Sequence, residues 1–120
     1  YDKAIQVAEK IHYDNDKCEV LTNISNSLCN KEQYDKAIQV ANKIPYDDDR
    51  FKALTNISNI LYDLSNSLCN KEQYDKAIQV AEKIPYNTDK YETLSNIAES
   101  LYNAGQTDKA ITLYDKAIQV

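Results

Sequence analysis

Apolar residues return every three or four positions along most of the chain, which is the spacing of one face of an α-helix. The segment QYDKAIQVANKI (33–44) shows this spacing with the residues Tyr34, Ala37, Ile38, Ala41 and Ile44. Longer segments carry stripes of their own: Leu21, Ile24 and Leu28 in one, and Leu94, Ile97 and Leu101 in another. One glycine and two prolines leave few tight turns for strands. The pattern predicts an all-α protein built from pairs of helices.

The chain also repeats itself. The phrase YDKAIQV occurs four times, beginning at Tyr1, Tyr34, Tyr74 and Tyr114. With a period of 33 residues, segment 17–45 aligns with 89–113, and segment 50–85 matches both once the seven residues ILYDLSN (60–66) are set aside. We interpret the chain as a single array cut from a longer one. Its expected parts are the end of a preceding repeat (1–17), a repeat (18–50), a repeat with the insertion (51–90) and a last, truncated repeat (91–120).

An insertion of seven residues suits a helix. A heptad falls about 20° short of two full helical turns, so an apolar face survives the addition. The middle repeat keeps its pattern through the insertion, at Leu54, Ile57, Leu61, Leu64 and Leu68. We therefore predict one lengthened helix near 49–69, about 10 Å longer than its siblings, with part of its apolar flank exposed. The alternative is a break near Asp63–Ser65 that gives an additional short helix.

Polar residues mark the expected starts of the longer helices. Equivalent aspartates stand where they can cap these helices, at Asp16, Asp49 and Asp89. Two of them begin a D-x-x-E capping box with Glu19 and Glu92. We therefore expect these aspartates to accept hydrogen bonds from the first free backbone N–H groups.

Proline and glycine mark the expected ends. Pro45 and Pro85 are expected to stop the shorter helices, because the residue before a proline avoids the α region. Gly105 can supply a left-handed end to the last long helix. The other repeats have Glu32 and Glu72 in place of that glycine, and we expect the preceding asparagines, Asn30 and Asn70, to help end those helices.

With these features the chain resembles a tetratricopeptide-repeat (TPR) array. The last repeat follows the family's pattern on its first helix, at the turn glycine and on its second helix, with Leu94, Ile97, Ala98, Leu101, Gly105, Ala110, Tyr114 and Ala117. The first repeat matches at Leu21, Ile24, Ser25, Leu28, Tyr34 and Ala37. The resemblance implies a right-handed α-solenoid of antiparallel helix pairs, here with about seven helices. The chain departs from the pattern in its 33-residue period and in the small Ala41 and Ala81, where a bulky aromatic is usual.

Charge and cysteine content narrow the function. The formal net charge is −5, from 14 basic and 19 acidic residues, whereas a nucleic-acid ligand requires the opposite balance. No apolar run approaches the roughly 18 residues needed to cross a membrane. Cys18, Cys29 and Cys69 form no CxxC pair, and their odd number favours a reducing compartment. We expect a cytoplasmic protein with no nucleic-acid or membrane partner.

Few residues could carry chemistry. His12 is the single histidine and is interpreted as a loop substitution for the proline of the sister repeats. The acidic run Asp47–Asp49 lacks the spacing and the glycine of a calcium loop, so it is interpreted as a cap with a solvated loop. A lone Gly105 makes no glycine-rich phosphate loop. We therefore predict no enzymatic activity, no catalytic residues, no metal and no cofactor.

A second, polar set of residues also recurs at helical spacing beside the apolar stripes. In the resembled family the first helix of each pair lines a concave groove, and asparagines in corresponding places hold a peptide backbone. The resemblance implies a peptide-binding face made of Glu19, Thr22, Asn23, Asn26, Lys52, Thr55, Asn56, Asn59, Glu92, Ser95, Asn96 and Glu99. An asparagine amide suits this role because it offers both a donor and an acceptor to an extended chain.

The partner predicted from this set is a protein or peptide segment of neutral to basic charge. Thr22 and Asn23 are uncharged, so the basic pair with which some family members grip a C-terminal carboxylate is not reproduced. The polar residues could instead be a solvated face that duplication copied. The alternative function is a structural, self-associating array whose open ends, or residues 60–68, mediate homo-oligomers.

Overall fold

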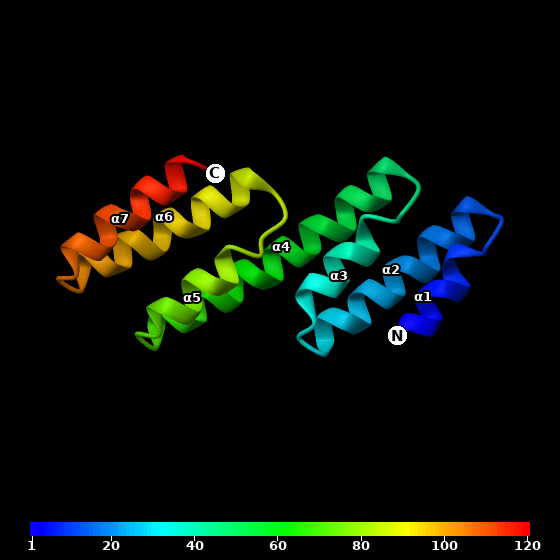
Figure 1. The fold of residues 1–120 in the computed structure, drawn as a ribbon, viewed down its shortest axis with the longest axis horizontal. Coiled ribbons are helices and arrows are strands. Elements are labelled where there is room, and N and C mark those ends of the chain that lie inside the picture. The colour runs from blue at the N-terminus through cyan, green and yellow to red at the C-terminus, as the bar shows by residue number, and fades with distance from the viewer. The chain divides into compact units, whose positions relative to one another are not determined.

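The structure is a computed structural model that describes residues 1–120, and it contains seven α-helices and no strands (Figure 1). The helices are α1 (Asp2–Glu9), α2 (Asp14–Asn30), α3 (Tyr34–Ala41), α4 (Asp47–Asn70), α5 (Tyr74–Ala81), α6 (Asn87–Asn103) and α7 (Thr107–Ile118). The all-α prediction is confirmed. The lengthened helix is also confirmed, since α4 has 24 residues against 17 in α2 and α6. The alternative break near Asp63–Ser65 is wrong because α4 is continuous there.

The chain divides into two compact units, Tyr1–Ile57 and Ser58–Val120. In the first unit α2 packs against α1 and α3, and in the second α6 packs against α5 and α7. Helix α4 crosses the border and contributes its N-terminal part to the first unit and its C-terminal part to the second. The repeat boundaries and the right-handed winding expected from the sequence stay predictions.

The core of each unit consists of the leucine and isoleucine stripes that the sequence pattern predicts. Leu21 and Leu28 on α2, and Leu94 and Leu101 on α6, are fully buried. Small residues on the partner helices allow close packing, because Ala37, Ala41, Ala77 and Ala81 have no exposed surface. Close interdigitation of such side chains excludes water from the interface between paired helices.

A buried serine joins two of the helix pairs in the same way. The Ser25 hydroxyl on α2 donates to the Ala37 carbonyl of α3 at 3.0 Å. The Ser65 hydroxyl on α4 donates to the Ala77 carbonyl of α5 at 3.2 Å. Each bond satisfies a polar group in the core, and both span 12 residues. The two helix pairs therefore share one register.

The shorter helices within each unit carry matching ion pairs. In the first unit Lys36 pairs with Asp2 and Lys43 pairs with Glu9, which joins α3 to α1. In the second unit α7 is joined to α5 by two pairs at corresponding positions, Lys109 with Asp75 and Lys116 with Glu82. These pairs are exposed to solvent and salt, so each contributes little to stability. The matching positions of these ion pairs favour one register between the shorter helices, while their effect on the free energy of unfolding is small.

The long helices end in a left-handed residue. Gly105 has φ +84°, and the Gln106 N–H donates to the Leu101 carbonyl at 2.9 Å, which is the bond of a Schellman motif. This confirms the predicted role of Gly105. The same conformation is adopted by Glu32 and Glu72, with φ 60° and 59°.

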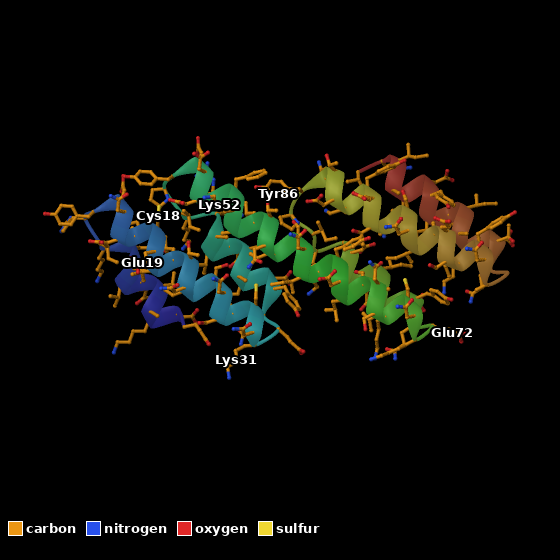
Figure 2. The ribbon with its side chains drawn as sticks, turned by 180° about the vertical axis from the view of Figure 1, so that it is seen from behind. Cys18, Glu19, Lys31, Lys52, Glu72 and Tyr86 are labelled. Atoms are coloured by element: carbon orange, nitrogen blue, oxygen red, sulfur yellow. The ribbon has the colours of Figure 1, made fainter.

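The positions of Asn30 and Asn70 agree with the expected ends of the other two long helices. Asn30 and Asn70 are the last residues of α2 and α4 and keep their place in the helix. The left-handed residue stands two positions after the helix in each turn, whatever its side chain, because the Schellman geometry requires it there. Figure 2 shows Glu72 in the turn between α4 and α5.

The predicted N-terminal caps are also wrong. Helices α2 and α6 begin at Asp14 and Asn87, three residues earlier than the capping scheme requires, and neither start has a side-chain capping bond. Asp16, Asp49 and Asp89 therefore lie in the first turn, and the boxes with Glu19 and Glu92 do not form. In the first turn a carboxylate still interacts favourably with the helix dipole.

The prolines do not end the shorter helices directly. Helix α3 ends at Ala41 and α5 at Ala81, four residues before Pro45 and Pro85. In the intervening turn the Lys43 N–H donates to the Val40 carbonyl at 3.0 Å, an i→i−3 bond. The chain therefore tightens into a 3₁₀-like turn before each proline.

The insertion lies well inside α4. Leu61 is buried, and Ile60, Leu64 and Leu68 are partly buried. Leu68 is therefore less buried than its counterparts Leu28 and Leu101, which agrees with the expected partial exposure of this apolar flank. Most of the exposed large apolar side chains lie elsewhere, for example Val7 on α1 and Ile111 and Ile118 on α7.

Candidate peptide-binding face

All twelve residues of the predicted peptide-binding face lie on the long helices α2, α4 and α6. Eight are exposed, namely Glu19, Asn23, Asn26, Lys52, Asn56, Asn59, Glu92 and Glu99. The other four are partly buried, namely Thr22, Thr55, Ser95 and Asn96. Helical spacing places these residues beside the leucine stripe, so the buried side chains of each helix hold the polar ones at the surface.

In the first unit the polar faces of α2 and α4 meet. The Asn56 amide on α4 donates to the Asn26 amide oxygen on α2 at 3.4 Å. That separation is at the long end for a hydrogen bond, and both side chains are exposed. The two amides are therefore close together and available to a third polar group.

A hollow of about 240 Å³ lies on the same side of the first unit. Its lining includes three predicted residues, Glu19, Thr22 and Asn23. Cys18 and Asp49 border it as well, and burial raises the pKa of the Cys18 thiol, with the Asp49 carboxylate acting in the same direction. Lys52 belongs instead to an open depression beside Pro45 at the start of α4.

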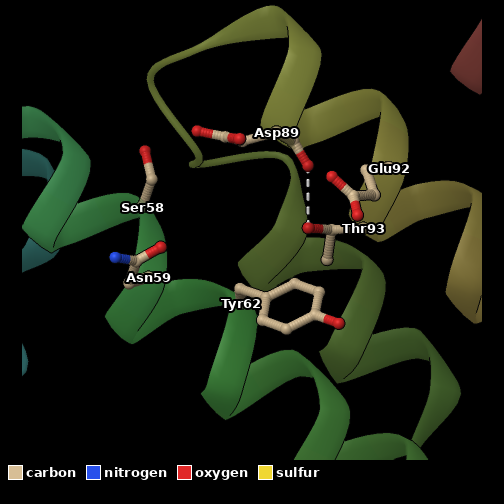
Figure 3. Close-up of a pocket in the computed structure, with 6 residues that line it drawn as sticks. All are labelled: Ser58, Asn59, Tyr62, Asp89, Glu92 and Thr93. Atoms are coloured by element: carbon tan, nitrogen blue, oxygen red, sulfur yellow. Dashed lines mark hydrogen bonds between the residues drawn. The ribbon is translucent and has the colours of Figure 1, made fainter.

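The second unit has its own hollow, of about 220 Å³, between α4 and α6. Its lining residues are Ser58, Asn59, Tyr62, Asp89, Glu92 and Thr93 (Figure 3). The Thr93 hydroxyl donates to the Asp89 backbone carbonyl at 2.8 Å, which leaves the Asp89 carboxylate unused by that contact. We call it the α4–α6 hollow. Carboxylates, hydroxyls, an amide and an aromatic ring line it.

The sequence pattern predicts two residues of the α4–α6 hollow, Asn59 and Glu92, and misses four. Tyr62 belongs to the insertion, so no sister repeat indicates a role for it. Asp89 has the position of a helix cap in the repeat. Ser58 and Thr93 directly neighbour predicted residues on their helices but are almost completely buried, at 1% and 0% exposure. Successive residues on a helix are rotated by about 100° about its axis. The sequence does not indicate that the hollow extends from the predicted residues to these neighbours.

The arrangement of side chains gives little support for a metal site or for a membrane-spanning helix. No group of three or more histidine, cysteine, aspartate or glutamate side chains is placed to hold a metal ion. His12 lies exposed between α1 and α2. The run Asp47–Asp49 forms the first turn of α4, where Asp47 pairs with Arg50. None of the helices combines the length and the apolar character that a membrane span requires.

Residues 92–120 match the family model of the tetratricopeptide repeat, and this segment includes most of α6 and all of α7. A search of curated proteins gives no match. The matched segment coincides with the repeat in which the resemblance is densest in the sequence.

Proposed function

We propose that this chain, a TPR-like helical repeat protein, is a non-catalytic scaffold that binds a segment of a partner protein along the polar faces of α2, α4 and α6. TPR repeats in general mediate protein–protein interaction, and that coarse role applies to this chain. The finer proposal concerns which residues bind and which partner they take.

The exposed asparagines of the long helices carry the proposal. Asn23, Asn26 and Asn56 lie at the surface of the first unit, and two of them already exchange a hydrogen bond. An extended peptide presents alternating N–H and C=O groups, and each amide can serve either kind of group. Binding through the backbone tolerates varied sequences and leaves specificity to the neighbouring hollows.

The net charge favours a neutral to basic partner segment. At −5 the chain attracts cations over a range set by ionic strength, about 10 Å at 0.1 M salt. Both hollows contain carboxylates, Glu19 and Asp49 in one and Asp89 and Glu92 in the other. An acidic segment would meet repulsion in both places.

Fluorescence anisotropy with labelled peptide pools of basic, neutral and acidic composition tests the proposal. We expect binding in the order basic, neutral, acidic, and a loss of about tenfold or more when Asn23, Asn56 and Asn96 are all changed to alanine. The matched control replaces three exposed asparagines outside the face, Asn30, Asn42 and Asn103. Equal affinity for the two triple variants would refute the proposal.

Self-association is a second candidate, favoured by apolar side chains at the surface of α7. Ile111 and Ile118 are 54% and 71% exposed, and Val7 on α1 is 60% exposed. Light scattering at high concentration measures the molar mass directly. A strict monomer, unchanged by deletion of 60–66 or by polar substitution of Ile111 and Ile118, would exclude this candidate.

We also propose a reducing location, the cytoplasm. Cys18, Cys29 and Cys69 are all free thiols, and the first two are buried. Burial raises the pKa of Cys29 and of Cys69, so both thiols are held in their less reactive form. Fluorescent tagging of the chain in its native cell tests the location.

A further inference from the structure

The α4–α6 hollow contains a polar group that nothing in the chain uses. The Ser58 hydroxyl is buried, with the residue 1% exposed, and it has no hydrogen-bond partner. Its counterpart seven residues later, Ser65, donates to a backbone carbonyl in the usual way. A buried hydroxyl without a partner is costly. Ser95 on α6 is in the same state, but only Ser58 lines the hollow, where its hydroxyl could serve a ligand.

Two carboxylates approach the same space from α6. Asp89 and Glu92 are three residues apart on α6 and both line the hollow, so two like charges belong to one helix face. Figure 3 shows the Asp89 carboxylate extending from α6 toward the side of the hollow on which Ser58 and Asn59 lie. In the second unit Lys109 pairs with Asp75 and Lys116 with Glu82, so these two lysines are engaged by residues outside the hollow.

We propose that the α4–α6 hollow binds the ammonium group of a lysine side chain supplied by the partner segment. This inference rests on the proposed function and names a specificity site within it. A lysine ammonium has three donors and no acceptor. The three acceptors are the Asp89 carboxylate, the Glu92 carboxylate and the Ser58 hydroxyl. A serine has three staggered rotamers, so its hydroxyl can turn toward the ligand without movement of the backbone.

The remaining lining residues fit the rest of a lysine side chain. The Tyr62 ring borders the hollow, where it can pack against the aliphatic stem and attract the cation. The volume of about 220 Å³ is below the roughly 300–1,000 Å³ of typical small-molecule sites, so a single side chain fits better than a cofactor. A metal ion is a poorer occupant because no cluster of three ligands is formed.

Titration of ¹⁵N-labelled protein with N-acetyl-lysine methylamide, followed by NMR, tests this site without a peptide. We expect saturating shifts at the amides of Asn59, Tyr62 and Thr93. The neutral isostere N-acetyl-norleucine methylamide is expected to bind about tenfold more weakly. Added salt is expected to weaken the lysine derivative alone. Shifts that do not saturate, or that are equal for the two compounds, would overturn the proposal.

Substitutions separate binding from folding. Ser58→Ala is expected to weaken the lysine derivative about three- to tenfold while leaving the protein at least as stable, because it removes a hydroxyl that the fold does not satisfy. Glu92→Gln is expected to weaken it by a similar factor. The control Asp63→Asn removes a charge from an exposed position of α4 outside the hollow and is expected to change nothing. Unchanged affinity in both Ser58→Ala and Glu92→Gln would contradict the assignment.

Peptides distinguish failure of this inference from failure of the proposed function. A labelled neutral nonapeptide with a central lysine is compared with its norleucine counterpart. Equal affinity of the two, combined with a loss in the Asn23, Asn56 and Asn96 variant, would sink the lysine site and leave the scaffold role standing. Saturation by the lysine derivative without any effect of the three asparagines on peptide binding would support the lysine site and count against the asparagine face.

Discussion

Glu72 stands in a backbone conformation that suits glycine. Its φ of 59° lies in the left-handed region, as does the φ of 84° at Gly105 in the corresponding turn of α6. This conformation costs an L-residue about 1–2 kcal/mol, because its Cβ crowds the following carbonyl oxygen. We therefore predict that Glu72→Gly makes the protein more stable.

The expected gain is smaller than the strain removed. Glycine also widens the conformational freedom of the unfolded chain, which costs about 0.4–1 kcal/mol on folding. The difference leaves a net stabilisation of about 0.5–1 kcal/mol. The reverse change, Gly105→Ala, is expected to destabilise by a similar amount. A Cβ at Gly105 would meet no atom within 4 Å, so its cost comes from the backbone alone.

Urea unfolding followed by circular dichroism measures the change, and a heat scan is expected to show a rise in Tm of about 2–5 °C. Glu72→Ala is the control, because it removes the carboxylate but keeps the Cβ, and it should leave stability nearly unchanged. Glu32→Gly in the other unit should give a similar gain, and the two gains should add. The strain argument is refuted if Glu72→Ala stabilises as much as Glu72→Gly, since the effect would then come from charge.

Three further outcomes are expected. Ser65→Ala is predicted to cost about 1 kcal/mol in urea unfolding, because it removes a buried hydrogen bond to the Ala77 carbonyl, whereas Ser58→Ala is neutral or stabilising. Burial raises the pKa of the Cys18 thiol, so the folded state holds its proton more tightly than the unfolded state does. Stability should therefore fall as pH rises above the unfolded thiol pKa of about 8.5, and less steeply in Cys18→Ala. Lys109→Ala breaks an exposed ion pair at 2.8 Å and should cost less than about 1 kcal/mol at 0.15 M salt.

The helices are predictable from the sequence because burial determines their pattern. The stripe at Leu21, Ile24 and Leu28 can be hidden from water only by a helix with a facing partner, and each of these residues is buried. The seven-residue insertion is predictable for the same reason, since the apolar spacing at Leu54 and Leu61 passes through it unchanged.

Helix ends are harder to predict because several local signals compete. Asp16 has the chemistry of a cap, but the helix starts two residues earlier. Glu72 adopts a conformation that its residue type disfavours, which indicates that the turn geometry overrides local preference. The α4–α6 hollow is only partly visible in the sequence, because the role of Ser58 depends on which acceptors its helix brings near, and that is a property of packing alone.

Helix α4 limits where this array can be divided for experiments. It runs without interruption across the border between Ile57 and Ser58. Cleaving the chain at that border, or ending an expressed fragment there, would interrupt α4 within a turn. The two new helix ends would lose their intrahelical backbone hydrogen bonds. Amide hydrogen exchange should accordingly report slow opening along the middle of α4, and the natural places to trim the chain are the turns at Pro45 and Pro85, which follow a complete helix pair.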